Sequence, residues 1–203
     1  MNQFFIRFYL FIFSSIVLIW LSTSLGANPK IGLEIIEENG NYGFKSKQGL
    51  VVVQPKYSMA FEFSKHGVAF VFRDGNWYCI NVKSEELLSP FIFDNGPDYF
   101  SEKFARFVEN NKMGFFDESC RKRIPANFDF VKPFENGTAI VCNGCNKEFM
   151  GEHYRIIGGK YGVIDKNGKT FVPIEYDSID SVDLKKKIAK VKKENKVLDL
   201  KWK

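Results

Sequence analysis

The chain has 203 residues, of which 45% are hydrophobic and 26% charged. These proportions are typical of a globular protein and exclude an intrinsically disordered one, and the length favours a single domain. The net charge of +5 is concentrated at the C-terminal end, where residues 185–203 contain nine Lys and only two acidic residues. Because the body of the chain is mildly acidic, we expect no nucleic-acid partner.

The first 27 residues have the layout of a secretory signal peptide. Arg7 precedes the apolar segment 8–21, and the small-residue segment 22–27 provides a cleavage region. We therefore expect residues 1–27 to form a hydrophobic signal helix and the mature chain to be exported to the periplasm, the cell surface or the extracellular medium. The alternative is an uncleaved membrane anchor, because the run 4–21 is interrupted only by Arg7 and two serines.

The clearest structural pattern in the chain covers residues 161–176. Tyr161–Asp165 has the composition of a strand, Asn167-Gly168 is a turn signal, and a second strand follows that Pro173 is expected to end. The same pattern occurs in three upstream units, which begin at Tyr42, Trp77 and Met113.

The units repeat with a regular spacing. Pro55, Pro90 and Pro125 are each 35 residues apart, which lies in the range expected for stacked or radial repeats. A second spacing of eight residues joins an alanine to the first residue of the next unit, as from Ala69 to Trp77. The same spacing is found from Ala105 to Met113 and from Ala189 to Val197.

One unit departs from this spacing. Ala139 and Tyr161 are 22 residues apart, which indicates an insertion of fourteen residues that we place at 142–155. We therefore predict an all-β domain over residues 28–203, with about four antiparallel β-meander units of about 35 residues and half-units at both ends. The sequence leaves open whether they form a solenoid-like array or a partial propeller.

The repeat pattern resembles that of the bacterial WG-repeat (KWG-repeat) proteins. The resemblance rests on Tyr-Gly-Val-Ile-Asp at 161–165, the later Val172-Pro173 and Tyr176-Asp177, and Phe-Glu-Asn-Gly-Thr-Ala at 134–139. It extends from residue 39 to about residue 200, although no Trp-Gly pair is complete. The resemblance implies a β-repeat fold with a binding or scaffolding role and supplies no catalytic residues.

The lysine-rich end has two interpretations. As a helix it would be a basic amphipathic segment for a membrane or nucleic acid. As part of the repeat, Ala189–Lys192 alternates between apolar and charged residues and precedes a turn at Glu194-Asn195. The repeat spacing favours a terminal strand whose lysines hinder edge-to-edge association.

Four cysteines in an exported chain indicate disulfides. Cys142-Asn143-Gly144-Cys145 lies in the insertion, and we predict that Asn143-Gly144 forms a hairpin turn across which the two sulfurs meet. Cys79 and Cys120 lie in adjacent units and are then either paired with each other or free.

The insertion is also the best candidate for a functional site, because departures on repeat scaffolds often map to a binding face. We expect an exported, non-enzymatic scaffold that binds a protein or a glycan through this loop, without catalytic, cofactor or metal sites. The binding-loop candidates are Asn143, Phe149, His153 and Tyr154.

The alternative is a redox or metal-binding protein centred on Cys142 and Cys145. His153 would be a third metal ligand, but the sequence offers no credible fourth. A membrane would be reached only through an uncleaved signal or the basic tail.

Overall fold

The computed structural model describes residues 32–202, so the predicted signal peptide lies outside the described residues. Within this range every regular element is a β-strand, and no helix there is able to cross a membrane. The strands form successive antiparallel sheets that follow the chain order.

Three complete or nearly complete units make up the first half of the array. Their strands are β1 (Leu33–Glu38), β2 (Asn41–Ser46), β3 (Val51–Tyr57), β4 (Met59–Ala60), β5 (Val68–Arg73), β6 (Asn76–Asn81), β7 (Glu86–Leu88), β8 (Ile92–Phe93), β9 (Gly96–Pro97), β10 (Phe104–Glu109), β11 (Lys112–Asp117) and β12 (Lys122–Phe128). The second half contains β13 (Phe130–Val131), β14 (Thr138–Met150), β15 (His153–Asp165), β16 (Thr170–Tyr176), β17 (Ser178–Asp183), β18 (Ile188–Lys193) and β19 (Lys196–Lys201).

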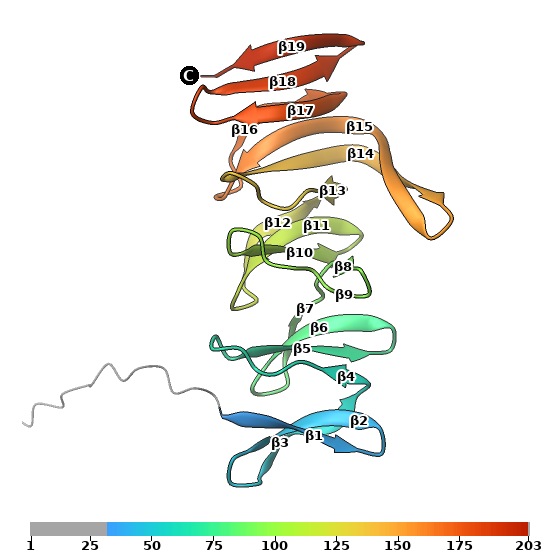
Figure 1. Cartoon of the computed structure of the whole chain (residues 1–203), viewed down its shortest axis with the longest axis vertical. Coiled ribbons are helices and arrows are strands. Elements are labelled where there is room, and N and C mark those ends of the chain that lie inside the picture. The colour runs from blue at the N-terminus through green and yellow to red at the C-terminus, as the bar shows by residue number, and fades with distance from the viewer. Residues whose placement is uncertain (1–31, 203) are drawn as a thin grey trace, which may run out of the picture.

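The sheets stack in single file along the long axis of the molecule, from the N-terminal sheet at one end to the C-terminal sheet at the other (Figure 1). The predicted all-β fold of tandem antiparallel meanders is therefore confirmed. Of the two arrangements left open by the sequence, the described chain has the solenoid-like one. The lysine-rich end forms strands β18 and β19 with a turn at Glu194-Asn195, so the helical interpretation is wrong.

The hydrophobic core is divided into layers between successive sheets. In the second sheet, Ala69 and Ile80 pack in one cluster with Phe44 of the preceding sheet. Their neighbours Val68 and Cys79 pack in another cluster with Phe107 of the following sheet. Because side chains alternate between the two faces of a strand, an inner sheet buries both faces and depends on both neighbours.

The glycine that follows the first residue of a unit, called here the aromatic position, is required for steric reasons. A Cβ on Gly162 would lie 2.6 Å from the carbonyl oxygen of Val172, and a Cβ on Gly114 would lie 2.7 Å from the amide nitrogen of Ala126. In both units the return strand bulges over the glycine, so its backbone occupies the space of a side chain.

The prolines were predicted to end the return strands, and this prediction is wrong. Pro55, Pro125 and Pro173 lie inside β3, β12 and β16, where the strand register shifts. Each of these strands is the outermost of its sheet, so the missing N–H of the proline costs no ladder hydrogen bond.

Candidate binding site at the inserted hairpin

The inserted residues lie between the two residues of an ordinary repeat turn. The other units connect their two central strands by two residues that both have positive φ, as in Asp74-Gly75 (52° and 77°) and Glu194-Asn195 (50° and 64°). Gly144 and Gly159 occupy the equivalent positions and keep this conformation, with φ of 74° and 71°. The extra residues are therefore 145–158, three positions later than we placed them from the sequence.

The predicted hairpin turn at Asn143-Gly144 does not form. Strand pairing continues with the same register on both sides of Gly144, with Asn143 opposite Lys160 and Cys145 opposite Gly158. The chain reverses instead at Gly151-Glu152, between β14 and β15. Residues 145–158 thus form a second hairpin that extends the parent one, and Figure 1 shows it curving away from the column.

The structure places the cysteines in two pairs at disulfide-bonding distance. Cys142 and Cys145, with Cα atoms 6.2 Å apart, lie on one strand at the junction of the inserted hairpin with the parent sheet. Cys79 and Cys120, with Cα atoms 6.5 Å apart, lie in the cluster between the second and third sheets. All four side chains are buried, and two such pairs are typical of a protein from an oxidising compartment.

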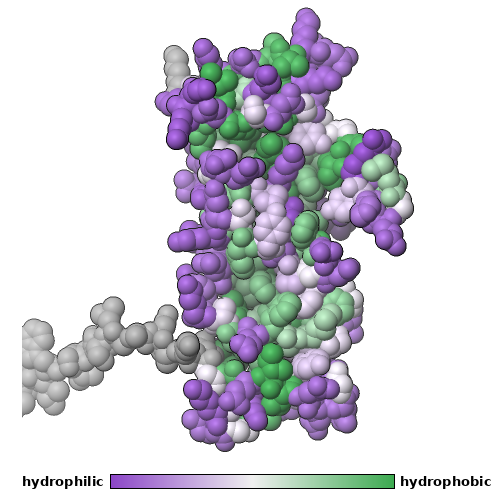
Figure 2. All heavy atoms as spheres, in the orientation of Figure 1, coloured by the Kyte–Doolittle hydropathy of each residue, from purple (hydrophilic) through white to green (hydrophobic). Residues whose placement is uncertain are grey.

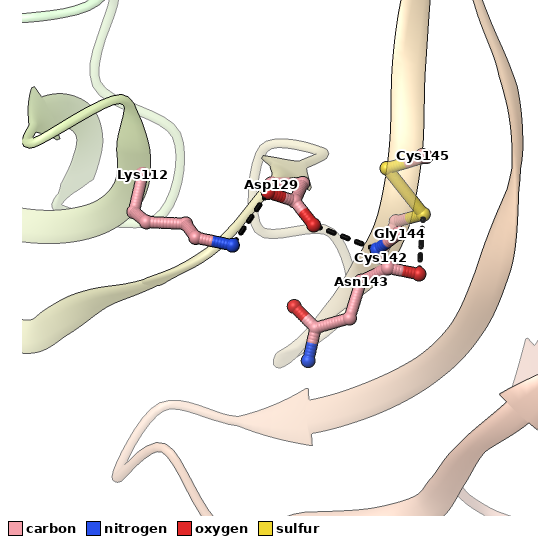
Figure 3. The surroundings of a disulfide bond; sticks show 6 residues. All are labelled: Lys112, Asp129, Cys142, Asn143, Gly144 and Cys145. Carbon is pink, nitrogen blue, oxygen red and sulfur yellow. Dashed lines mark hydrogen bonds and ion pairs between the residues drawn. A yellow bond between two sulfur atoms is a disulfide. The ribbon is translucent and has the colours of Figure 1, made fainter.

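Lys112, Asp129 and Gly144 form a charged clamp at the junction of the inserted hairpin with the parent sheet (Figure 3). One carboxylate oxygen of Asp129 accepts a hydrogen bond from Nζ of Lys112 at 2.6 Å, and the other accepts one from the amide of Gly144 at 2.6 Å. These two interactions, with Lys112 the stronger, hold the pKa of Asp129 below its usual range. The clamp therefore fixes Gly144 in the position of a turn residue, although the chain no longer turns there.

The same clamp recurs one unit later. Asp177 accepts hydrogen bonds from Nζ of Lys160 at 2.6 Å and from the amide of Glu194 at 2.7 Å. These interactions lower the pKa of Asp177, and Lys160 has the larger effect. In both units the lysine immediately precedes the aromatic-position residue, and the amide belongs to the first turn residue of the next hairpin. The insertion is thus anchored by contacts that the following unit of the repeat also has.

The far end of the inserted hairpin exposes apolar side chains. Phe149 is 73% exposed and lies opposite Tyr154, with ring centroids 6.1 Å apart. Nζ of Lys147 lies 4.6 Å from the centroid of the Tyr154 ring and 5.6 Å from that of Phe91, so the hairpin comes close to the body of the array. In Figure 2 the projecting lobe carries both hydrophobic and hydrophilic residues.

A groove of about 610 Å³ lies between the hairpin and the next unit. Ile156, Gly158 and Tyr161 line it from β15, and residues 177–179 line it from the start of β17. A cavity of about 310 Å³ shares Ile140, Lys132 and Ile179 with this groove and adds Glu135 and Asp180, so the two adjoin each other.

A cavity at the equivalent position is also present in the first two units. A cavity of about 590 Å³ in the first two units is lined by Trp77, Phe61 and residues 94–96, which correspond to Tyr161, Lys132 and residues 177–179. The insertion alters the second copy of this cavity, because Ile156 and Gly158 belong to the inserted hairpin.

The structure brings only some of the predicted site residues together. Phe149 and Tyr154 are opposite each other near the end of the hairpin and His153 is the next residue along β15, whereas Asn143 lies at the junction, opposite Lys160. His153 is opposite Met150, five pairs along the ladder from Cys145, which is roughly 17 Å at the rise of a β-strand. The structure therefore does not place His153 beside the two cysteines as a metal ligand.

Sequence reasoning missed the groove and the clamp. Asp129 and Asp177 recur at equivalent positions of their units, but an aspartate at a repeat position is also typical of turns and strand ends. The signal that could have identified their role is the lysine that precedes the aromatic position in the same units, Lys112 and Lys160. Nothing in the sequence indicated that Ile156 and Ile179 would face the same cavity.

Comparison with known proteins gives one family. The family model described as WG containing repeat matches residues 42–77, 113–146 and 161–196, which together make up more than half of the chain. The second of these segments ends at residue 146, just inside the inserted hairpin. The comparison with curated proteins finds no match.

Proposed function

Because the chain belongs to the WG-repeat family, we propose that it is an exported, non-enzymatic scaffold whose binding face is the inserted hairpin and the groove beside it. The partner is a protein or a glycan. Export is supported by the signal-like segment 1–27 and by the two cysteine pairs at disulfide distance.

The observation that carries the proposal is the position of the insertion. Fourteen residues are placed between Gly144 and Gly159 without changing the conformation of either, so the parent unit keeps its turn geometry and its clamp. The hairpin buries little of its own apolar surface, since Phe149 and Met150 are 73% and 53% exposed. Exposed apolar residues that the fold does not need are typical of a binding surface.

The redox or metal alternative has weaker support. Thiol exchange requires an accessible sulfur, but Cys142 is 0% and Cys145 is 8% exposed. A metal site at the junction would need ligands other than His153, which lies at the far end of the hairpin.

The test is to remove residues 145–158 and join Gly144 directly to Gly159, with Cys142→Ala so that no unpaired thiol remains. The mature chain and this variant are immobilised and exposed to the exported proteins of the source organism and to an oligosaccharide array. We expect at least one ligand that the mature chain retains and the variant loses. Retention of the same ligands by both proteins would exclude the hairpin as the binding face.

A further inference from the structure

We propose that the ligand of this site is an extended peptide segment that pairs as an additional strand with the free edge of β15, and that it carries a Lys or Arg toward Glu135 and Asp180. This inference rests on the proposed function and specifies its partner.

The first observation is an unpaired strand edge. β15 runs from His153 to Asp165, but its partner β16 pairs with it only between Tyr161 and Ile164. On this side of β15, residues 153–160 have no neighbouring strand in the described chain. Residues 153–157 precede Gly158 and Gly159, whose φ values are 65° and 71°, and the backbone N–H and C=O groups of this part of the edge are a template for another strand.

The second observation is that this edge lacks the protection found on other edges of the same molecule. The outermost strands β3, β12 and β16 each contain a proline, which cannot donate a ladder hydrogen bond. Residues 156–159 are Ile-Ile-Gly-Gly, with neither a proline nor a charge. A Cβ on Gly158 would meet nothing closer than 4.0 Å, so the face of the hairpin at this residue is open.

The third observation is that residues of β15 at this edge also line the groove. Ile156, Gly158 and Gly159 line the cavity of about 610 Å³, and Phe130, Ile140 and Ile179 add apolar surface from other strands. A peptide paired with β15 would direct alternate side chains into this apolar cavity. A glycan would use the polar groups of a site more than such a surface.

The charged residues that line the cavity next to the groove determine which charge the peptide should carry. Glu135 and Asp180 line the adjoining cavity together with Lys132, and within residues 32–202 none of the three forms an ion pair. Asp177 is neutralised by Lys160, so two free carboxylates face one ammonium group. The excess of negative charge favours a cationic side chain on the partner.

The experiment selects phage-displayed random dodecapeptides on the immobilised mature chain. We expect the selected peptides to alternate between apolar and polar residues and to be enriched in Lys or Arg. Methylating alternate backbone nitrogens of a selected peptide should weaken its binding by about tenfold or more, because the ladder hydrogen bonds are lost.

Protein variants test the groove and the charges separately. Ile156→Asp should weaken binding by about tenfold or more, whereas Leu50→Asp, at a 71%-exposed position of the first sheet, should not change it. Selection on the Glu135→Lys, Asp180→Lys double variant should give peptides enriched in Asp or Glu instead. Melting temperatures of all variants identify any that fail to fold.

Three results would overturn the inference: no peptide is enriched, N-methylation has no effect, or the charge reversal leaves the selected sequences unchanged. Binding of an oligosaccharide array that disappears on removal of residues 145–158 would also exclude a peptide ligand. That result would leave the proposed function intact. The proposed function itself fails only if nothing binds in a way that depends on the hairpin.

Discussion

The glycine and the proline of a repeat unit act through the backbone rather than through side-chain contacts. Gly114 and Gly162 are needed because the bulged return strand occupies the space above them, and the bulge contains the proline of the same unit. Where Tyr78 replaces the glycine, the return strand β7 has three residues and pairs with only Cys79 and Ile80. Glycine and proline are therefore two parts of one packing arrangement.

Gly114→Ala tests this relation. The new Cβ would lie 2.7 Å from the amide nitrogen of Ala126, and because backbone cannot move aside easily, we expect the free energy of unfolding to fall by about 1–3 kcal/mol. Gly96→Ala is the control, since its nearest atom would be 3.8 Å away, and it should change stability by about 0.5 kcal/mol or less. Equal effects in chemical denaturation would contradict the steric explanation.

The carboxylate of Asp129 makes stability depend on pH in a defined direction. Its pKa is lowered in the folded protein, by Lys112 first and by the amide of Gly144 second. The stabilisation is therefore fully present above the unfolded-state pKa of about 3.9 and is lost as the pH falls through the lower folded-state value.

Asp129→Asn should reduce the free energy of unfolding at neutral pH by about 1 kcal/mol, because the charged hydrogen bonds are weakened. The difference from the wild type should shrink as the pH falls below the unfolded-state pKa of about 3.9, because the wild-type carboxylate is progressively protonated. Asp180→Asn is the matched control, since Asp180 is exposed and forms no ion pair in the described chain. Denaturant titrations across this pH range would refute the clamp if the two variants behaved alike.

At the scale of elements, one cysteine pair connects two sheets and the other connects two positions on one strand. Cys79 and Cys120 are separated by 41 residues and join neighbouring sheets, whereas Cys142 and Cys145 are separated by three residues on one strand. A cross-link stabilises chiefly by restricting the unfolded chain, and the effect grows with the length of the closed loop. The first pair therefore belongs to the fold and the second to the junction of the insertion.

We expect the Cys79→Ala, Cys120→Ala variant to lose about 4 kcal/mol of stability and the Cys142→Ala, Cys145→Ala variant about 2 kcal/mol. Unfolding of the oxidised proteins measures both losses, and the loss for the Cys79 and Cys120 pair should be the larger. A larger loss for the Cys142 and Cys145 pair would mean that the junction is a structural centre of the array.

The sequence predicted these elements where a local rule decides them. Two-residue turns at positions such as Asp74-Gly75 follow from residues that tolerate positive φ, and the terminal strands β18 and β19 follow from the eight-residue spacing. It failed at Gly144, which has the conformation of a turn residue in a chain that does not turn. The local preference for positive φ is met both at Asp74-Gly75 and at Gly144. The two positions differ only in that the second turn-like residue, Gly159, is distant from Gly144 in the sequence.

The groove was beyond sequence reasoning for a different reason. Ile156 and Ile179 come from strands in different sheets, and their meeting depends on how one sheet is placed on the next. Repeat spacing gives the order of the sheets but not the gap between an inserted hairpin and its neighbour. The residues of a repeat core are therefore easier to predict than those of a site on it.

At the scale of the whole molecule, each inner sheet is stabilised by burying both faces against its neighbours, and the inserted hairpin takes little part in this. The four buried clusters contain residues of successive sheets, and of residues 145–158 none belongs to them. The proposed binding face is thus separate from the residues that stabilise the array. A repeat array can accept such an addition because its layers are built independently of the loop ends.

The most direct test of this division is the free energy of unfolding of the variant in which Gly144 is joined to Gly159 and Cys142 is Ala, compared with that of the Cys142→Ala, Cys145→Ala variant. We predict values within about 1 kcal/mol of each other and a single cooperative transition in both. A variant without residues 145–158 that is destabilised by more than about 3 kcal/mol, or that no longer folds, would contradict the account.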